Sequence, residues 1–238
     1  MNPDEFRAFG HRLIDWIADY RATTESRPVM SAVEPGSIRA QLPTTPPEGP
    51  EPMDAVFRDF EKIVVPGLSH WQHPRFFGYF PSNGELSSVL GDYLSTGLGV
   101  LGLSWQSSPA LTEVEEVMTD WLRQMVGLSD KWSGVIQDTA STSTLVALIC
   151  ARERASSYSL VKGGIQSVPS PLVVYVSAHA HSSVDKAALL AGFGRDHVRL
   201  VPTDAAFAMR PDSLADAIRQ DIAAGLKPNS VQAKDFKV

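Results

Sequence analysis

Residues 134–148 read Gly-Val-Ile-Gln-Asp-Thr-Ala-Ser-Thr-Ser-Thr-Leu-Val-Ala-Leu, and this stretch decides how the rest of the chain is interpreted. Its apolar start, Val135-Ile136, predicts the end of a buried strand, and from Thr144 the apolar spacing becomes helical. A hydroxyl-rich turn lies between them. The first N–H groups of a helix lack partners within the helix, and the helix dipole adds positive potential there. The stretch therefore predicts a phosphate site, where small side chains such as Ala140 and Ser141 let the anion reach the backbone.

Two observations keep an ordinary helix cap open as the alternative. Ser, Thr and Asp are favoured at helix N-termini when no ligand is present. In addition, Asp138 brings a negative charge close to the expected anion. The motif alone leaves both interpretations open.

The composition is that of an ordinary globular protein, since 43% of the 238 residues are hydrophobic and 20% are charged. This length suffices for one large domain or two small ones. The net charge of −6 and the lack of a Lys/Arg run argue against nucleic acid as a partner. The single cysteine, Cys150, allows no internal disulfide and indicates a reducing compartment. No stretch reaches the ~20 apolar residues of a membrane span, and the first residues do not resemble a signal peptide, so we expect a cytoplasmic protein.

The N-terminal part of the sequence predicts two helices joined by a proline-rich strap. Asn2 can cap a helix that runs to about residue 20, and its apolar stripe must be covered by its own domain or by a second subunit. Residues 43–52 contain five prolines and favour an extended strap, which is either a linker or a segment laid over a surface. A second amphipathic helix is expected over residues 54–64.

Residues 69–82 are dense in aromatic side chains and contain two prolines, so we expect an ordered loop there. His70 and His73 could share a metal, but no third ligand lies near them in the sequence, and no metal is predicted. The aromatic side chains are either a core plug or the wall of a pocket for a flat ligand. The pattern alone favours the plug.

The second half of the sequence alternates helices and strands. Glycines between residues 85 and 104 suggest close backbone packing, and residues 112–126 predict a helix with a capping box formed by Thr112 and Glu115. The remaining elements are predicted strands and helices over residues 172–176, 182–191, 198–201 and 211–224. This alternation indicates an α/β fold with a parallel or mixed sheet, without the GxGxxG turn of a dinucleotide-binding fold.

Five segments together resemble the aromatic-L-amino-acid decarboxylases, the group II decarboxylases that use pyridoxal 5′-phosphate. They follow the order and spacing of that family, and the resemblance extends from residue 2 to residue 228. The segments are residues 70–77 (His-Trp-Gln-His-Pro-Arg-Phe-Phe), 79–82 (Tyr-Phe-Pro-Ser), 104–110 (Ser-Trp-Gln-Ser-Ser-Pro-Ala), 134–147 and 181–184 (His-Ser-Ser-Val).

The resemblance implies a cofactor site. A pyridoxal-phosphate enzyme needs an anchor for the phosphate, a partner for the flat ring, a carboxylate at the pyridine nitrogen and a lysine that bonds covalently to the cofactor. By the resemblance, Ser82, Ala140 and Ser141 would bind the cofactor. His181 would stack on its ring and act catalytically, donating a proton to the substrate carbon after CO2 leaves. Without the family motif, a lone histidine after a strand would be interpreted as a cap or a core polar group.

The resemblance also implies a substrate and a partner. Trp71, Tyr79 and Phe80 would line the pocket for an aromatic side chain, and Leu101 and Leu103 would reach the site of a neighbouring subunit. Members of the family form homodimers in which the N-terminal helices wrap over the partner. We therefore expect a homodimer that acts on a small aromatic amino acid and has no membrane partner.

The implied fold is that of the fold-type I pyridoxal-phosphate enzymes, α/β with a mixed, mostly parallel sheet. Residues 1–84 would form an N-terminal helical dimerisation segment, residues 85–228 a partial cofactor-binding large domain, and residues 229–238 an atypical tail. The tail is polar and differs from the apolar strand that the family has at this position. We expect a truncation, with a shifted reading frame or altered splice supplying the last ten residues.

Two of the four cofactor requirements are missing from the sequence. It contains neither the family's His-x-Asp-Ala run nor its lysine after a histidine, and Lys186 is expected to be a solvated helix residue. The resemblance implies decarboxylation of an aromatic L-amino acid to the amine and CO2, with negligible activity for this chain alone. One alternative is an inactive truncated or degenerate homologue that at most dimerises or binds the phosphate. Another is a different fold-type I enzyme, although the aromatic pocket and the lack of clustered arginines favour aromatic over acidic substrates.

Overall fold

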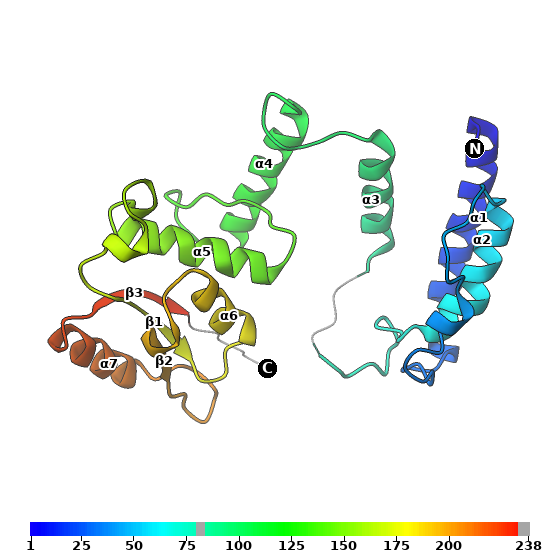
Figure 1. The fold of residues 1–238 in the computed structure, drawn as a ribbon. Coiled ribbons are helices and arrows are strands. Elements are labelled where there is room, and N and C mark those ends of the chain that lie inside the picture. The colour runs from blue at the N-terminus through cyan, green and yellow to red at the C-terminus, as the bar shows by residue number, and fades with distance from the viewer. Residues whose placement is uncertain (80–83, 233–238) are drawn as a thin grey trace. The chain divides into compact units, whose positions relative to one another are not determined.

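The computed structural model describes residues 1–79 and 84–232, which form two compact units (Figure 1). Unit 1 comprises Met1–Leu101, and unit 2 begins at Gly102. Among the described residues, no helix has both the length and the apolar composition needed to cross a membrane.

Unit 1 is built from helices. It contains α1 (Pro3–Ala22), α2 (Met53–Asp59), a π-helical turn (Phe60–Val64) and α3 (Leu86–Leu98), with short 3-10 turns at Thr24–Ser26, Arg39–Gln41 and Val65–Gly67. The start of α1 is fixed by a capping box: the Asn2 side chain accepts the N–H groups of Asp4 and Glu5, and the Glu5 carboxylate accepts the Asn2 N–H. The two helices predicted in this region are confirmed.

The apolar stripe of α1 is covered, in part, within unit 1. Phe9 and Trp16 make edge contacts with Phe57, at ring-centroid distances of 5.7 and 5.9 Å, and Trp16 also contacts Phe60 at 5.3 Å. The Trp16 indole donates a hydrogen bond to Glu61 at 2.9 Å. Of the two alternatives left open by the sequence, the structure shows packing against the unit's own second helix. Phe6 nevertheless remains half exposed.

Two buried histidines hold the loop after α2. Tyr20 Oη lies 2.6 Å from His70 Nδ1. His73 Nδ1 accepts the Arg75 N–H at 2.9 Å, which leaves the proton on Nε2 for the Glu25 carbonyl 3.1 Å away. The two rings therefore tie this loop to α1 and to the turn at Thr24–Ser26. Burial, followed by the charge of Arg27 and the neighbouring His73, lowers the pKa of His70 below its ordinary value.

Unit 2 is an α/β unit. Its helices are α4 (Pro109–Met125), α5 (Ala140–Ala155), α6 (Ser182–Leu190) and α7 (Pro211–Ala223), and its strands are β1 (Leu172–Ser177), β2 (Val198–Val201) and β3 (Lys227–Gln232). Short 3-10 turns occupy Ser159–Val161, Ile165–Ser167 and Arg195–His197. The three strands are parallel in the order β2-β1-β3. The α/β prediction is confirmed.

The central strand β1 is buried on both faces, with helices on each side of the sheet (Figure 1). Leu172, Val174 and Val176 pack with α5 and α6 on one face. Val173 and Tyr175 face α7 on the other. A continuous apolar run such as Leu-Val-Val-Tyr-Val is what a strand covered on both faces requires.

Strand β3 was not predicted, because its sequence, Lys-Pro-Asn-Ser-Val-Gln, is polar. It pairs with β1 with a register shift opposite Val173 and Val174. Lys227 Nζ and Asn229 Nδ2 donate hydrogen bonds to the Ala155 and Ala151 carbonyls of α5, at 2.7 and 3.0 Å. These polar contacts with the end of α5 explain why a polar segment occupies a strand position.

The structure corrects two expectations about the segments next to α4. Val135 and Ile136 are exposed and not in a strand, because the Ile136 N–H bonds to the Glu115 carboxylate instead of to a neighbouring strand. The Thr112 capping box is wrong, because α4 already begins at Pro109 and the Thr112 hydroxyl donates to the carbonyl of the preceding turn.

The expected close packing around the glycines of residues 85–104 holds at Gly102, where an added Cβ would lie 3.3 Å from the Leu111 side chain, but not in α3. A Cβ atom placed on Gly91 or Gly97 would meet nothing within 4 Å. Gly99 has φ +62°, so it ends α3 in the left-handed conformation that glycine tolerates.

A buried polar cluster ties α7 to the sheet. Asp221 accepts a hydrogen bond from Tyr175 Oη at 2.9 Å and forms an ion pair with Arg199 at 2.7 Å. Burial alone would raise the pKa of Asp221, but the bonds from Arg199 and Tyr175 outweigh it and hold the pKa below its ordinary value. Burial, and then the bond to Asp221, raises the pKa of Tyr175.

We predict that Asp221→Asn lowers the free energy of unfolding at pH 7 by about 2–3 kcal/mol, somewhat less than the loss for a fully buried pair because Arg199 is partly exposed. The native pKa of Asp221 lies below its unfolded value, so this stabilisation is present above about pH 4 and is lost as the pH falls through the native pKa. Urea unfolding between pH 3 and 7 measures it. The control is Asp216→Asn, which removes an exposed ion pair with Arg219 on the same helix and should cost far less. Equal losses for the two variants would contradict the account.

A second prediction concerns His70. Because its pKa is lowered in the folded chain, the unfolded chain binds the proton first, and unit 1 should lose stability as the pH falls below about 6.5. We expect the imidazole of His70 to titrate, by NMR, with a midpoint below that value. A midpoint at or above it would show that burial and Arg27 do not act on the ring as described.

Candidate active site

Two helices of unit 2 begin at the same edge of its sheet. His181 follows β1 after the short turn at residues 178–180 and caps α6, so α6 starts at the carboxyl end of β1. The last turns of α5 contact Lys227 and Asn229 at the start of β3, so α5 runs antiparallel to the strands and its N-terminus lies at the same carboxyl edge. In parallel α/β sheets this edge is where ligands bind.

The N-terminus of α5 is capped and still has free donors. Thr139 is the N-cap, with extended backbone at φ −143° and ψ 159°, and its hydroxyl accepts the Thr142 N–H at 3.2 Å. Within the described part of the chain, the N–H groups of Ala140 and Ser141 have no partner. The ordinary cap and the predicted anion site are therefore compatible, because the cap uses one N–H and leaves two.

Asp138, which argued against an anion site, is exposed to solvent. Water and salt weaken the repulsion between an exposed carboxylate and a nearby anion. The repulsion between Asp138 and an anion is therefore weaker than the sequence alone suggests.

His181 lies at the corresponding position of α6. Its Nδ1 accepts the Ser183 N–H at 3.2 Å and lies 2.9 Å from the Ser183 hydroxyl. An Nδ1 that accepts places the proton of the neutral ring on Nε2, and this assignment follows from the hydrogen bonds. His181 therefore caps α6, as the cap interpretation expects. Its ring nevertheless remains exposed, and Nε2 has no bond to any described residue.

One residue at this edge was not singled out from the sequence. His179 lies two residues before His181, and its ring makes an edge contact with Phe207, at 5.1 Å between centroids, in the loop after β2. The His-x-His spacing was the available signal, but spacing alone does not show that a loop from another strand approaches the first histidine.

The predicted aromatic contacts lie in unit 1. Trp71 stacks on Phe76 at 5.0 Å and on Tyr79 at 5.5 Å. Phe76 is buried, whereas Trp71 is 43% exposed and Tyr79 87% exposed. Phe76 is thus buried, as the plug interpretation expects, whereas the pocket interpretation of the exposed Trp71 and Tyr79 stays a prediction. Phe80 and Ser82 lie outside the described residues.

The other predicted site residues are exposed. Leu101, the last residue of unit 1, and Leu103, in unit 2, are large apolar side chains open to solvent. In unit 2 the structure brings Ala140, Ser141 and His181 to one edge, and in unit 1 it brings Trp71 and Tyr79 together.

The donor set of unit 2 fits the phosphate and the ring of a pyridoxal-phosphate cofactor. Two free N–H groups at a helix N-terminus suit a phosphate, and an exposed imidazole suits a flat ring. The described lysines offer no such match for the covalent link. Lys162 and Lys227 donate hydrogen bonds to the Ser157 and Ala155 carbonyls, just beyond and at the C-terminus of α5. Lys62 and Lys131 are exposed, and Lys186 is exposed on α6, as expected.

Comparison with known proteins identifies one family. The profile of the pyridoxal-dependent decarboxylase conserved domain matches residues 35–234. The aromatic-L-amino-acid decarboxylase of Bos taurus is 42% identical over 98% of this chain and 50% of its own length. The phenylacetaldehyde synthase of Arabidopsis thaliana is 40% identical over 96% of this chain and 47% of its own. The crystal structure of Catharanthus roseus tryptophan decarboxylase in complex with L-tryptophan superposes with a TM-score of 0.89, at 39% identity, over 97% of this chain and 50% of that one.

The fold is thus that of the fold-type I pyridoxal-phosphate enzymes, present here as N-terminal helices and part of the large domain. The chain belongs to the pyridoxal-dependent decarboxylase family, in its group II aromatic-amino-acid branch. It spans about half the length of the curated relatives it matches.

We predict that Ala140→Pro weakens phosphate binding without disrupting α5. Ala140 is the first residue of the helix, where proline is tolerated, and the extended Thr139 suits a following proline. The change removes one N–H donor. Since a hydrogen bond to a charged group contributes about 1.5–3 kcal/mol, affinity for pyridoxal phosphate should fall at least about tenfold.

The matched control is Ser182→Pro, which removes the equivalent first N–H of α6. Isothermal titration with pyridoxal phosphate, together with circular dichroism, separates binding from folding. The assignment to α5 fails if Ser182→Pro weakens binding and Ala140→Pro does not.

Proposed function

We propose that this chain carries the phosphate anchor and the ring-stacking histidine of a pyridoxal-phosphate enzyme that decarboxylates an aromatic L-amino acid to its amine and CO2. One observation carries the proposal: the free N–H groups of α5 and the exposed His181 ring lie at the carboxyl edge of one parallel sheet. A homodimer and a cytoplasmic location, both expected from the sequence, are parts of the same proposal.

Each residue has a defined task in this proposal. The Ala140 and Ser141 N–H groups bind the phosphate dianion, and the positive end of α5 adds favourable potential. The His181 imidazole covers the ring, and its Nε2 proton is available for transfer to the substrate carbon. When bound, the cofactor supplies the electron sink that makes loss of CO2 possible.

Aromatic substrates are supported by unit 1. The exposed faces of Trp71 and Tyr79 offer a flat apolar surface suited to an aromatic side chain. The names of the relatives agree on aromatic chemistry but differ in product, because one is named a decarboxylase and another phenylacetaldehyde synthase. We place decarboxylation first because the family profile is that of a decarboxylase.

A second candidate is a chain that binds the phosphate but does not turn over substrate. The observation in its favour is that no described lysine matches the family's covalent lysine. The test incubates the purified chain with pyridoxal phosphate and L-tryptophan, L-tyrosine or L-phenylalanine, and measures cofactor retention, amine, aldehyde and CO2. Amine with CO2 supports decarboxylation, retained cofactor without product supports the second candidate, and no retention contradicts both.

We predict that His181→Asn separates the helix-capping role of His181 from its ring-stacking role. Asparagine is a good N-cap, so α6 should keep its stability. Loss of the ring should lower affinity for pyridoxal phosphate about three- to tenfold, in line with the strength of an aromatic stacking contact. His197→Asn is the control, because His197 precedes β2 at the opposite edge of the sheet and bonds through Nδ1 to the Phe193 carbonyl. Affinity unchanged in His181→Asn would contradict the stacking role.

A further inference from the structure

Arg152 joins the two helices whose N-termini form the site. It lies in the last turn of α5 and is buried, with 7% of its surface exposed. Its Nη1 donates a hydrogen bond to the carbonyl of Ala191, which caps the C-terminus of α6, and its Nε donates to Glu153 Oε1 at 3.0 Å. The last carbonyls of a helix have no partner within it, so this contact satisfies one of them.

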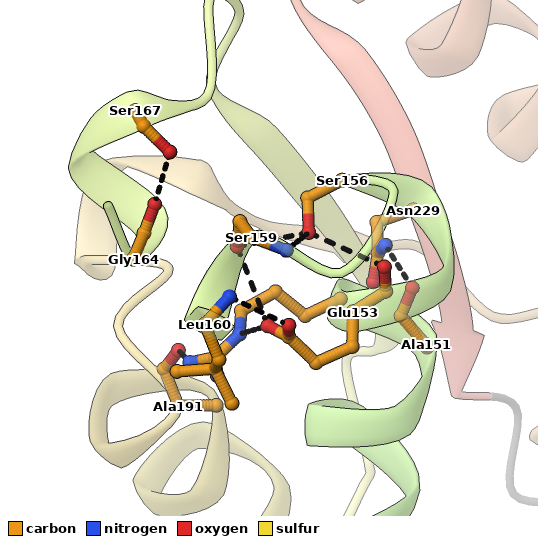
Figure 2. A network of polar contacts seen from close by, with 10 residues as sticks. Ala151, Glu153, Ser156, Ser159, Leu160, Gly164, Ser167, Ala191 and Asn229 are labelled. Carbon is orange, nitrogen blue, oxygen red and sulfur yellow. Dashed lines mark hydrogen bonds and ion pairs between the residues drawn. The ribbon is translucent and has the colours of Figure 1, made fainter. Parts of the chain in front are cut away.

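The guanidinium is itself held in place. The Glu153 carboxylate accepts the Leu160 N–H at 2.9 Å and the Ser159 hydroxyl at 3.4 Å, and Ser159 bonds in turn to Ser156. Figure 2 shows these groups converging beside the end of α5. The Leu160 N–H, more than the other contacts, lowers the pKa of Glu153, so the carboxylate stays ionised beside Arg152.

The rest of the contact between α5 and α6 is apolar and mostly small. Leu148 packs in one cluster with Val184, Ala187, Ala188 and Ala191. Hydrophobic attraction is not directional, whereas a hydrogen bond constrains both the distance and the angle between its two partners. A hydrogen bond at one end therefore determines the offset of α6 along α5 more sharply than this packing does.

The two helices run in the same direction. Both N-termini lie at the carboxyl edge, and Arg152 and Ala191 lie at the other end. Arg152 is twelve residues from Ala140, or about 18 Å along a rigid helix. A displacement of α6 at the end where Arg152 bonds to Ala191 also displaces its N-terminus at the site by the same amount, because a helix of this length does not compress.

We propose that Arg152 is a positioning residue, which sets the offset of α6 along α5 and so places the His181 ring relative to the Ala140 and Ser141 N–H groups. The effect of Arg152 on the offset of the two helices does not depend on the proposed function. Its effect on cofactor binding rests on the proposed function.

The test compares three variants of the full chain. Arg152→Met removes both hydrogen bonds, and Arg152→Lys keeps the charge but lacks the planar fork that reaches Glu153 and Ala191 together. Arg199→Met is the matched control, because it breaks the ion pair with Asp221 on the opposite face of the sheet. It should lower stability without moving α5 against α6.

The first measurement is the backbone amide NMR spectrum, at Ser141, Thr142, Ser182 and Ser183. Both Arg152 variants should shift these distant signals, with Met exceeding Lys, and Arg199→Met should not. Unchanged signals in Arg152→Met and Arg152→Lys would overturn the proposal, as would equal shifts in Arg199→Met. If Arg152→Met does not fold, the comparison of Arg152→Lys with Arg199→Met decides.

The second measurement is titration with pyridoxine 5′-phosphate, which lacks the aldehyde and cannot react with lysines. The wild-type chain should bind it, and Arg152→Met should bind about tenfold more weakly, because small misplacements of a binding geometry are costly. A wild-type chain that does not bind would contradict the proposed function, while the amide signals would still decide the role of Arg152.

Discussion

The functional features of unit 2 depend on the burial of β1 on both faces of its sheet. The strand is covered by α5 and α6 on one side and by α7 on the other, as is typical of parallel sheets, whose strands are joined by helical crossovers. This topology brings the carboxyl ends of the strands to one edge. It also brings the N-terminus of α6, and that of α5, to the same edge, where unpaired N–H groups and helix dipoles favour an anion.

The sequence predicted the elements whose periodicity is strong. The run from Leu172 identified β1, and the amphipathic stripe identified α1, because burial of one face or of both leaves a regular pattern. Strand β3 escaped prediction because its stability comes from β1 and from Lys227 and Asn229 bonding to α5. Such long-range contacts leave no periodic pattern of apolar residues in the local sequence.

The residues of the candidate site also differ in how far the sequence could predict them. Ala140 and Ser141 could be proposed from the turn between an apolar run and a helix, although the expected strand before it is absent. His181 depended on the family motif, because a histidine that caps a helix looks the same with or without a ligand. Arg152 could not be found at all, since its partner Ala191, the C-cap of α6, lies 39 residues away. Its contact exists only once the two helices have packed.

The central claim is that the carboxyl edge formed by α5 and α6 binds the phosphate and ring of the cofactor. Amide and imidazole NMR signals recorded during addition of pyridoxine 5′-phosphate to the wild-type chain test it most directly. The account predicts that the largest changes occur at Ala140, Ser141 and His181. Changes centred instead on the opposite edge of the sheet, around Phe193 and His197, would contradict it.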